Sequence, residues 1–242
     1  MLTFADELKQ SSIATWQQIL NHNFITEIYN GILPLAKFIF YLKQDRIFLE
    51  EFCRFLSVAK QKCSNSDANL VNKFFDDLLY STVNFEMKMQ DQLISDSLDM
   101  LLSSLSSSLD IKDLHYMIPN KITLEYTFYL RQVSSNGSIY EIVSAMAPCP
   151  WTYFEIAEKF LLSKSHHIQT NKIFKKWMHF YSSEESRRQV EELKNILCIL
   201  AGKKAKSHDK DKEDKLATMK KHFATACKYE FLFWDMGYHN HI

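Results

Sequence analysis

Apolar residues recur every three or four positions through most of the chain, the spacing that places them on one face of an α-helix. Turn-forming residues such as Gly31, Pro34 and Pro119 interrupt this pattern and separate the segments. The pattern predicts helices at residues 3–20, a short one ending at 31, then 35–62, 67–101, 122–132, 138–147, 150–164, 171–180, one ending at 201, and 215–238. The chain is therefore predicted to be all-α.

The helix predicted at residues 35–62 carries an aspartate within its apolar face. Asp45 shares one stripe with four aromatic residues, Phe38, Tyr41, Phe48 and Phe52. Burying a carboxylate costs free energy unless a donor, a cation or a ligand pairs with it. We therefore expect Asp45 to meet one of these three partners.

The last predicted helix places a second acid, Glu230, among apolar residues. Its neighbours on that face are Phe223, Ala226, Cys227, Phe233, Trp234 and Gly237. One buried acid is often a structural hydrogen-bonding residue. Two such acids, together with a nucleophile and several tyrosines, are better explained by a shared pocket. From the pattern alone, both interpretations stay open.

The candidate nucleophile is Cys149, which lies between Pro148 and Pro150. A residue before proline disfavours helical backbone, and proline is well tolerated as the first residue of a helix. We therefore expect Cys149 to be the N-cap of a helix, where unpaired N–H groups and the helix dipole favour the thiolate. A buried cysteine acting as a small apolar side chain is the commoner alternative. The position at a helix start, beside Trp151 and Tyr153, favours the reactive interpretation.

Composition limits the classes of function. The chain has 242 residues, only four glycines and four prolines, and 18 phenylalanines, which favours long helices and an aromatic core or cavity. Lys plus Arg and Asp plus Glu both number 29, so there is no basic excess to attract nucleic acid or an anionic membrane. The five cysteines form no C-x-x-C pair, which favours a reducing compartment. Because we recognise no signal peptide and no membrane span, we expect a cytoplasmic protein.

The nine histidines do not indicate a metal site, because none forms an H-x-x-x-H pair. His166 and His167 fall in a polar loop, and His239 and His241 in the tail, so solvated side chains are expected. His22 could be imagined as an axial haem ligand, but a helix-capping or packing role is favoured. There is also no glycine-rich phosphate loop and no G-x-S-x-G motif. We expect neither a metal nor a cofactor.

Several short motifs together resemble the TenA/thiaminase II family over nearly the whole chain. They are Gln44-Asp45, Tyr126-Thr127, Ala147-Pro148-Cys149-Pro150-Trp151-x-Tyr153, Trp177-x-x-x-Tyr181 and Tyr229-Glu230-x-x-Phe233-Trp234. The resemblance implies the haem-oxygenase-like helical fold, one catalytic domain over residues 1–242, and a homotetramer. It also implies hydrolysis of 5-aminomethyl-4-amino-2-methylpyrimidine to 4-amino-5-hydroxymethyl-2-methylpyrimidine in thiamin salvage. Some members also cleave thiamin.

The resemblance also implies a role for each matched residue. Cys149 matches the nucleophile, Glu230 the acid that handles a ring nitrogen, and Asp45 the carboxylate that holds the amino group. The substrate-binding aromatic residues are matched by Phe48, Tyr126, Tyr153 and Tyr181. Because another branch of the family has glutamate in place of the cysteine, Cys149 indicates the cysteine branch.

The chain departs from the family pattern at three positions. A common histidine is here Gln90, and a common glycine is Ala157; both changes are expected to affect packing. Phe48 lacks a hydroxyl that some members have, which bears on substrate preference. Two other classes of function are weighed: a non-catalytic protein that binds a pyrimidine or another flat metabolite, and a haem or quinone enzyme on the same scaffold. The first would need neither Cys149 nor Glu230, and the second rests on fold analogy alone.

Overall fold

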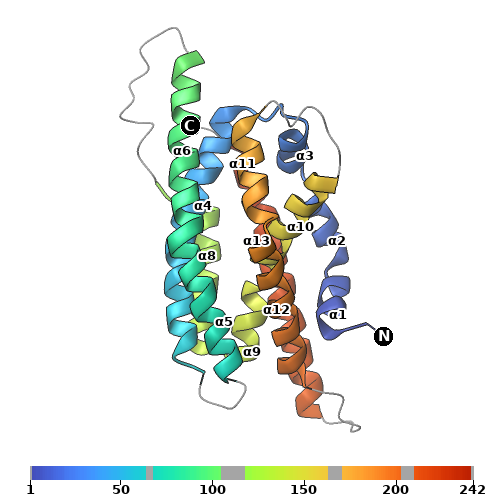
Figure 1. The fold of residues 1–242 in the computed structure, drawn as a ribbon. Coiled ribbons are helices and arrows are strands. Elements are labelled where there is room, and N and C mark those ends of the chain that lie inside the picture. The colour runs from blue at the N-terminus through green and yellow to red at the C-terminus, as the bar shows by residue number, and fades with distance from the viewer. Residues whose placement is uncertain (1, 64–67, 105–117, 163–170, 203–209, 241–242) are drawn as a thin grey trace.

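The computed structural model describes residues 2–63, 68–104, 118–162, 171–202 and 210–240. Its helices are α1 (Phe4–Ser11), α2 (Ile13–Leu20), α3 (Asn23–Tyr29), α4 (Leu35–Lys60), α5 (Ala68–Ser81), the π-helical segment η1 (Thr82–Glu86), α6 (Met87–Ser104), α8 (Lys121–Asn136), α9 (Ile139–Met146), α10 (Pro148–Leu162), α11 (Lys172–Tyr181), α12 (Glu184–Ala201) and α13 (Lys210–His239) (Figure 1). None of the described residues forms a strand. The prediction of an all-α protein is confirmed.

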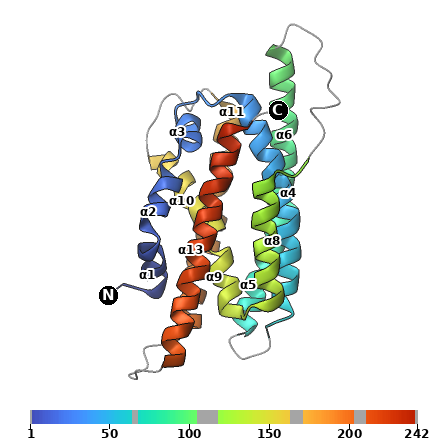
Figure 2. The ribbon, with the colours of Figure 1, turned by 180° about the vertical axis from the view of Figure 1, so that it is seen from behind.

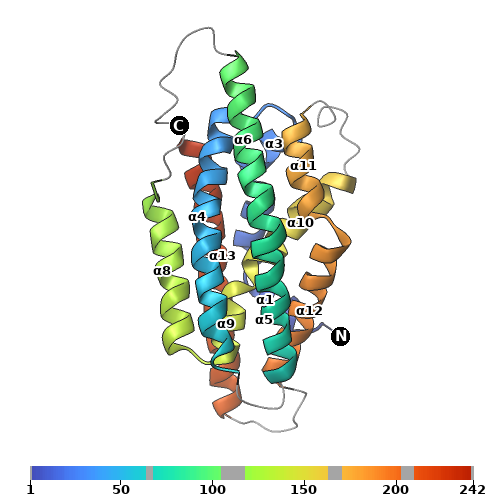
Figure 3. The ribbon, with the colours of Figure 1, turned by 60° about the vertical axis from the view of Figure 1, so that its left-hand side comes forward.

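The long helix α13 runs through the middle of the bundle (Figure 2). It packs against α1, α2 and α3 on one side and against α4, α8, α9 and α10 on the others. Its buried face carries apolar residues such as Phe223 and Trp234, and Glu230 lies among them. Helix α4, which contacts α13, also packs against α5, α6 and α8 (Figure 3). The two predicted acid-bearing stripes therefore belong to helices in direct contact.

The close approach of α13 to α4 and α3 depends on Gly237. A Cβ atom at this position would lie 3.2 Å from the Cβ of Tyr41 and 3.3 Å from Cε2 of Phe24. Contacts this short require a neighbour to move, and both neighbours are fully buried. Glycine is therefore needed here for packing, and its backbone is ordinary helix.

Three helix predictions need correction. The helix predicted at residues 3–20 is divided at Ser12, whose φ of −114° and ψ of 16° end α1 and begin α2. This bend lets both Leu8 and Trp16 be fully buried. The helix predicted at 215–238 begins earlier, at Lys210. Asp211 in its first turn is favourable near the positive end of the helix dipole.

The helix predicted at residues 67–101 is interrupted by η1, which connects α5 to α6 in nearly one line (Figure 3). A π-helical turn holds one more residue than an α-helical turn, and such turns occur frequently at functional sites. A sequence pattern based on 3.6 residues per turn does not reveal it.

The capping role expected for His22 is confirmed. Its Nδ1 accepts a hydrogen bond of 3.1 Å from the backbone N–H of Phe24, at the start of α3. His166 and His167 lie outside the described residues. No group of three or more potential ligands that could hold a metal ion occurs in the described part of the chain. Within the same residues, no helix combines the length and the apolar character needed to cross a membrane.

Candidate active site

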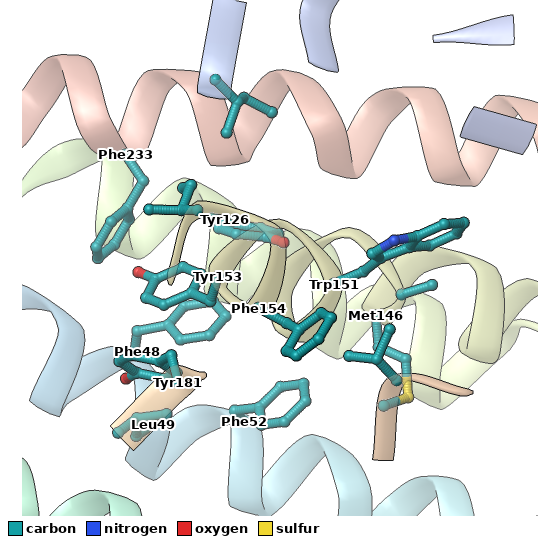
Figure 4. Close-up of a cluster of buried hydrophobic side chains, with 14 of the residues drawn as sticks. Phe48, Leu49, Phe52, Tyr126, Met146, Trp151, Tyr153, Phe154, Tyr181 and Phe233 are labelled. Atoms are coloured by element: carbon teal, nitrogen blue, oxygen red, sulfur yellow. The ribbon is translucent and has the colours of Figure 1, made fainter. Parts of the chain in front are cut away.

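A cavity of about 490 Å3 opens between α4, α5, η1, α10, α11 and α12. Four of the seven predicted site residues line it, namely Asp45, Cys149, Tyr153 and Tyr181. The rings of Tyr153 and Tyr181 meet edge to face with their centroids 4.9 Å apart. Figure 4 shows these two tyrosines beside Phe48, within the aromatic cluster of the core. The cavity is therefore partly aromatic, as expected for a site that holds a flat ring.

The other three predicted residues, Phe48, Tyr126 and Glu230, lie behind the cavity wall and are not among its lining residues. They are connected to it by direct contacts. The hydroxyl of Tyr126 donates a 2.7 Å hydrogen bond to Glu230 Oε1, and the Phe48 ring packs 5.0 Å from the Tyr126 ring. Glu230 also lies close enough to the Cys149 thiol for each group to shift the pKa of the other. The seven residues thus form one connected group.

The expected N-cap position of Cys149 is wrong. Helix α10 begins at Pro148, so Cys149 is its second residue, and the preceding Ala147 is also helical, with φ −60° and ψ −38°. The first turn of a helix has no intrahelical partners for its N–H groups, so prolines at both 148 and 150 cost no hydrogen bond there. This arrangement outweighs the preference of a residue before proline for extended backbone.

The expectation of a resting thiolate at Cys149 is also wrong. Burial raises the pKa of the Cys149 thiol well above its ordinary value, and the nearby carboxyl groups of Glu230, Glu86 and Asp45 raise it further. Negative charges nearby disfavour a second negative charge in a medium that screens it poorly. The helix dipole is a weaker influence than these effects combined. Attack by this sulfur therefore needs a group that takes its proton.

Glu230 is such a group. Its side chain is 2% exposed, and burial raises its pKa to about 7, although hydrogen bonds from Tyr126 and Cys149 favour the charged form. A carboxyl group with a pKa near neutrality can both give and take a proton under physiological conditions. Glu230 therefore combines the right position with the right acidity for general acid–base chemistry.

Among the residues that the structure describes, Asp45 meets hydrogen-bond donors and no cation. Its Oδ2 accepts from the hydroxyl of Tyr41 at 3.2 Å and from Nε2 of Gln90 at 2.5 Å, and its Oδ1 lies 3.5 Å from the hydroxyl of Tyr153. Burial, with the charge of Glu86 as the next cause, raises the Asp45 pKa well above its ordinary range. A neutral carboxyl group presents one donor and one acceptor side by side.

Gln90 was expected to affect packing, and it also contributes hydrogen bonds to the site. It is fully buried, and its Nε2 lies within hydrogen-bond distance of both Asp45 and the hydroxyl of Tyr181, the latter at 3.2 Å. The position that departs from the family pattern therefore fixes the orientation of Asp45. The neighbouring motif Glu86-Met-Lys-Met-Gln90 was the only sequence signal that could have indicated this.

Glu86 is a site residue that the sequence analysis missed. It ends η1, lines the cavity, and accepts a 2.8 Å hydrogen bond from the hydroxyl of Tyr181. Burial raises its pKa to about 7. In a regular α-helix, Glu86 would lie outside the apolar face on which the sequence pattern places Phe85. The apolar periodicity therefore could not identify Glu86 as a cavity residue. The site thus contains three acids, of which Asp45 and Glu230 are buried and Glu86 is half-buried.

Two further side chains hold the site helices in place. Glu155 accepts hydrogen bonds from the indole groups of Trp16 at 2.9 Å and Trp151 at 2.7 Å, which fixes α10 against α2. Gln44 accepts from the backbone N–H of Asn120 at 2.8 Å and from the hydroxyl of Thr123 at 2.7 Å, at the start of α8. The helices that carry Cys149 and Tyr126 are therefore anchored by buried polar contacts.

The fold and site together define a class: a helical bundle with a small-molecule cavity, a thiol on the cavity wall and acids able to move protons. Residues 10–240 match the model of the TENA/THI-4/PQQC family, so the chain belongs to this family. The aminopyrimidine aminohydrolase of Halalkalibacterium halodurans is 27% identical over 241 residues, which cover 100% of this chain and 98% of that protein. The protein of the same name from Helicobacter pylori is 27% identical over 231 residues, covering 96% of each chain.

Solved structures agree with this assignment. A TenA homologue protein from P. horikoshii superposes with a TM-score of 0.75 at 26% identity, covering 98% of this chain and 99% of that one. A domain from Shewanella denitrificans described as having a heme oxygenase-like fold superposes with a TM-score of 0.65 at 15% identity, over 95% and 91% of the two chains. The expected haem-oxygenase-like helical bundle is confirmed.

Proposed function

We propose that this chain is an aminopyrimidine aminohydrolase of the cysteine branch. It converts 5-aminomethyl-4-amino-2-methylpyrimidine and water to the 5-hydroxymethyl compound and ammonia, in thiamin salvage. The observation that carries the proposal is the cavity itself, which is lined by Asp45 and by Cys149, whose thiol lies beside the buried Glu230. The names of the full-length relatives support the same reaction.

Recognition of the pyrimidine rests on Asp45 and the aromatic residues. A 4-aminopyrimidine has a donor amino group beside an acceptor ring nitrogen. The protonated form of Asp45, which burial favours, presents the complementary acceptor and donor. Tyr153 and Tyr181 line the cavity with their rings in edge-to-face contact, and they exclude water from the bound pyrimidine ring. Phe48 and Tyr126 support this wall from behind.

The chemistry begins with a proton transfer. The protonated Glu230 gives its proton to a ring nitrogen, and its carboxylate then takes the proton of the Cys149 thiol. The sulfur forms a bond to the ring carbon that protonation has made electron-poor. Because Glu230 has a pKa of about 7, it can give a proton near neutral pH. Removal of the thiol proton is uphill, since the pKa of Cys149 is raised well above its ordinary value, and formation of the S–C bond offsets this cost. The hydroxyl of Tyr126 holds Glu230 in place by its 2.7 Å hydrogen bond.

The adduct then supplies the electron pair that expels the amine. An exocyclic double bond forms as the C–N bond breaks, and the nitrogen leaves with its bonding pair. Water adds its oxygen to the exocyclic carbon, and its released proton goes to the ammonia. Loss of the sulfur from the ring and return of the ring proton through Glu230 restore the free enzyme. Thiamin, whose thiazole occupies the same position, is the second candidate substrate.

Ammonia release from the aminomethyl pyrimidine tests the proposal. We expect turnover by the native chain and a loss of at least 1000-fold in kcat in Cys149→Ser, because the weakly acidic hydroxyl replaces the nucleophile. Cys227→Ser is the matched control, because that buried cysteine lies on α13 away from the lining residues. Binding of the pyrimidine without any turnover by the native chain would instead support a non-catalytic binding protein. Unchanged kcat in Cys149→Ser would remove the covalent step.

The family resemblance also supports assembly as a homotetramer, and the absence of any C-x-x-C pair among the five cysteines favours a cytoplasmic location. Size-exclusion chromatography with light scattering measures the first, and a mass four times that of one 28.5 kDa chain is the expected result. A monomeric mass at micromolar concentration would contradict it.

A further inference from the structure

Glu86 is a half-buried acid on the cavity wall that the proposed mechanism does not use. No ion pair joins it to a lysine, arginine or histidine among the residues the structure describes. The described residues that line the cavity include Asp45, Glu86 and Glu185 and no basic residue. Glu185 is already engaged at the surface, since Arg188 Nη2 lies 2.6 Å from its Oε1. The cavity around Glu86 therefore favours a cation.

The backbone supports a functional role for Glu86. Ser81, Phe85 and Glu86 all line the cavity, and η1 spans Thr82–Glu86. The additional residue in the π-helical turn rotates Glu86 onto the face that also carries Leu78. π-Helical turns inside α-helices are uncommon and cluster at functional sites. In this molecule the turn brings a carboxyl group to the cavity.

The shape of the cavity sets the direction of the leaving group. Next to Cys149, the side chains of Phe48, Tyr126 and Glu230 are each at most 2% exposed, so solvent does not enter the cavity from their side. Among the lining residues, Phe85 of η1 and Glu185 of α12 are exposed, whereas Asp45 and Tyr153 are buried, so the open part of the cavity lies on the side of η1 and α12. A ring held at Asp45 and facing Cys149 must therefore direct its larger substituent toward this open part. For the proposed substrate, that substituent is the aminomethyl group.

We propose that Glu86 binds the protonated amine of the substrate, and so selects pyrimidines whose leaving nitrogen carries a positive charge. This inference rests on the proposed function. A primary alkylamine is protonated at neutral pH, and it donates to the Glu86 oxygen that Tyr181 leaves unused. When the C–N bond breaks, the bonding pair stays on nitrogen, so the ammonium group departs as neutral ammonia without an additional proton donor.

Equilibrium binding separates this role from a structural one. In a Cys149→Ser background, which prevents turnover, calorimetry compares the cationic 5-aminomethyl pyrimidine with the neutral 5-hydroxymethyl pyrimidine. We expect Glu86→Gln to weaken binding of the amine by about 30-fold, the effect of losing one buried charge partner. The Kd of the hydroxymethyl compound should change by less than about threefold, because glutamine still accepts the hydrogen bond from Tyr181.

Glu185→Gln is the matched control, because this acid lines the same cavity but is bonded to Arg188. It should leave both dissociation constants within about twofold. Equal weakening of both ligands by Glu86→Gln, or no weakening of the amine, would overturn the inference. If neither the 5-aminomethyl nor the 5-hydroxymethyl pyrimidine binds, the inference and the proposed function are both overturned. Selective weakening of the amine without ammonia release by the native chain would support the inference and refute the hydrolase.

Discussion

Glu230 should make the stability of the folded chain depend on pH in a measurable way. Burial raises its pKa from the ordinary 4.5 to about 7, so the folded chain keeps this proton while the unfolded chain has released it. The free energy of unfolding therefore falls as pH rises from 4.5 to about 7, and the contribution stays constant above that. Each pKa unit corresponds to 1.36 kcal/mol, so the fall from this one group is about 3 kcal/mol.

Glu230→Gln removes this titration and keeps an oxygen that can accept the hydrogen bond from Tyr126. We expect the stability of the variant relative to the native chain to increase by about 3 kcal/mol between pH 4 and pH 8, since the titrating groups outside the site cancel in the difference. Urea unfolding followed by far-UV circular dichroism at each pH measures it. The corresponding gain in Tm is about 6–12 °C. A difference that does not change with pH would refute a buried, neutral Glu230.

Three further substitutions test other parts of the account. Asp45→Ala should weaken binding of the hydroxymethyl pyrimidine by about 30-fold in calorimetry, whereas Asp45→Asn, which keeps a donor and an acceptor, should weaken it far less; equal losses would contradict a neutral Asp45. Gln90→Leu should lower kcat/KM by about 10-fold, because Asp45 loses a buried donor, and Gln90→Glu should not restore it; unaltered kinetics would limit Gln90 to packing. Gly237→Ala should lower the free energy of unfolding by about 1–3 kcal/mol in urea titrations, because its Cβ meets Tyr41 and Phe24; native stability would show that α13 can move away at no cost.

The helical fold could be predicted because the apolar spacing is strong over long segments. The bounds expected for the helix at 35–62 and those observed for α4 differ by two residues at the C-terminal end. The break at Ser12 could not be predicted, because serine is compatible with a helix interior and tertiary packing decides the bend. The π-helical turn was also out of reach, since its hydrogen-bond pattern leaves no mark in a window of apolar spacing.

The site was predictable where an acid interrupts an apolar stripe, as at Asp45 and Glu230. It was not predictable at Glu86, because η1 moves that residue onto the buried face. The ionisation of Cys149 was misjudged for a different reason. The local sequence indicates a helix start, but burial and three carboxyl groups from other helices determine the pKa of the thiol. Long-range electrostatics of this kind is set by the fold.

The proposed chemistry requires three groups from different helices, on Asp45, Cys149 and Glu230, to meet around one flat ring. A crystal structure with bound 4-amino-5-hydroxymethyl-2-methylpyrimidine tests this directly. We expect the carboxyl group of Asp45 at the 4-amino group, that of Glu230 at a ring nitrogen, and the sulfur of Cys149 facing a ring carbon within van der Waals distance. A ring bound elsewhere in the bundle, or one in this cavity that meets neither carboxyl group, would contradict the account.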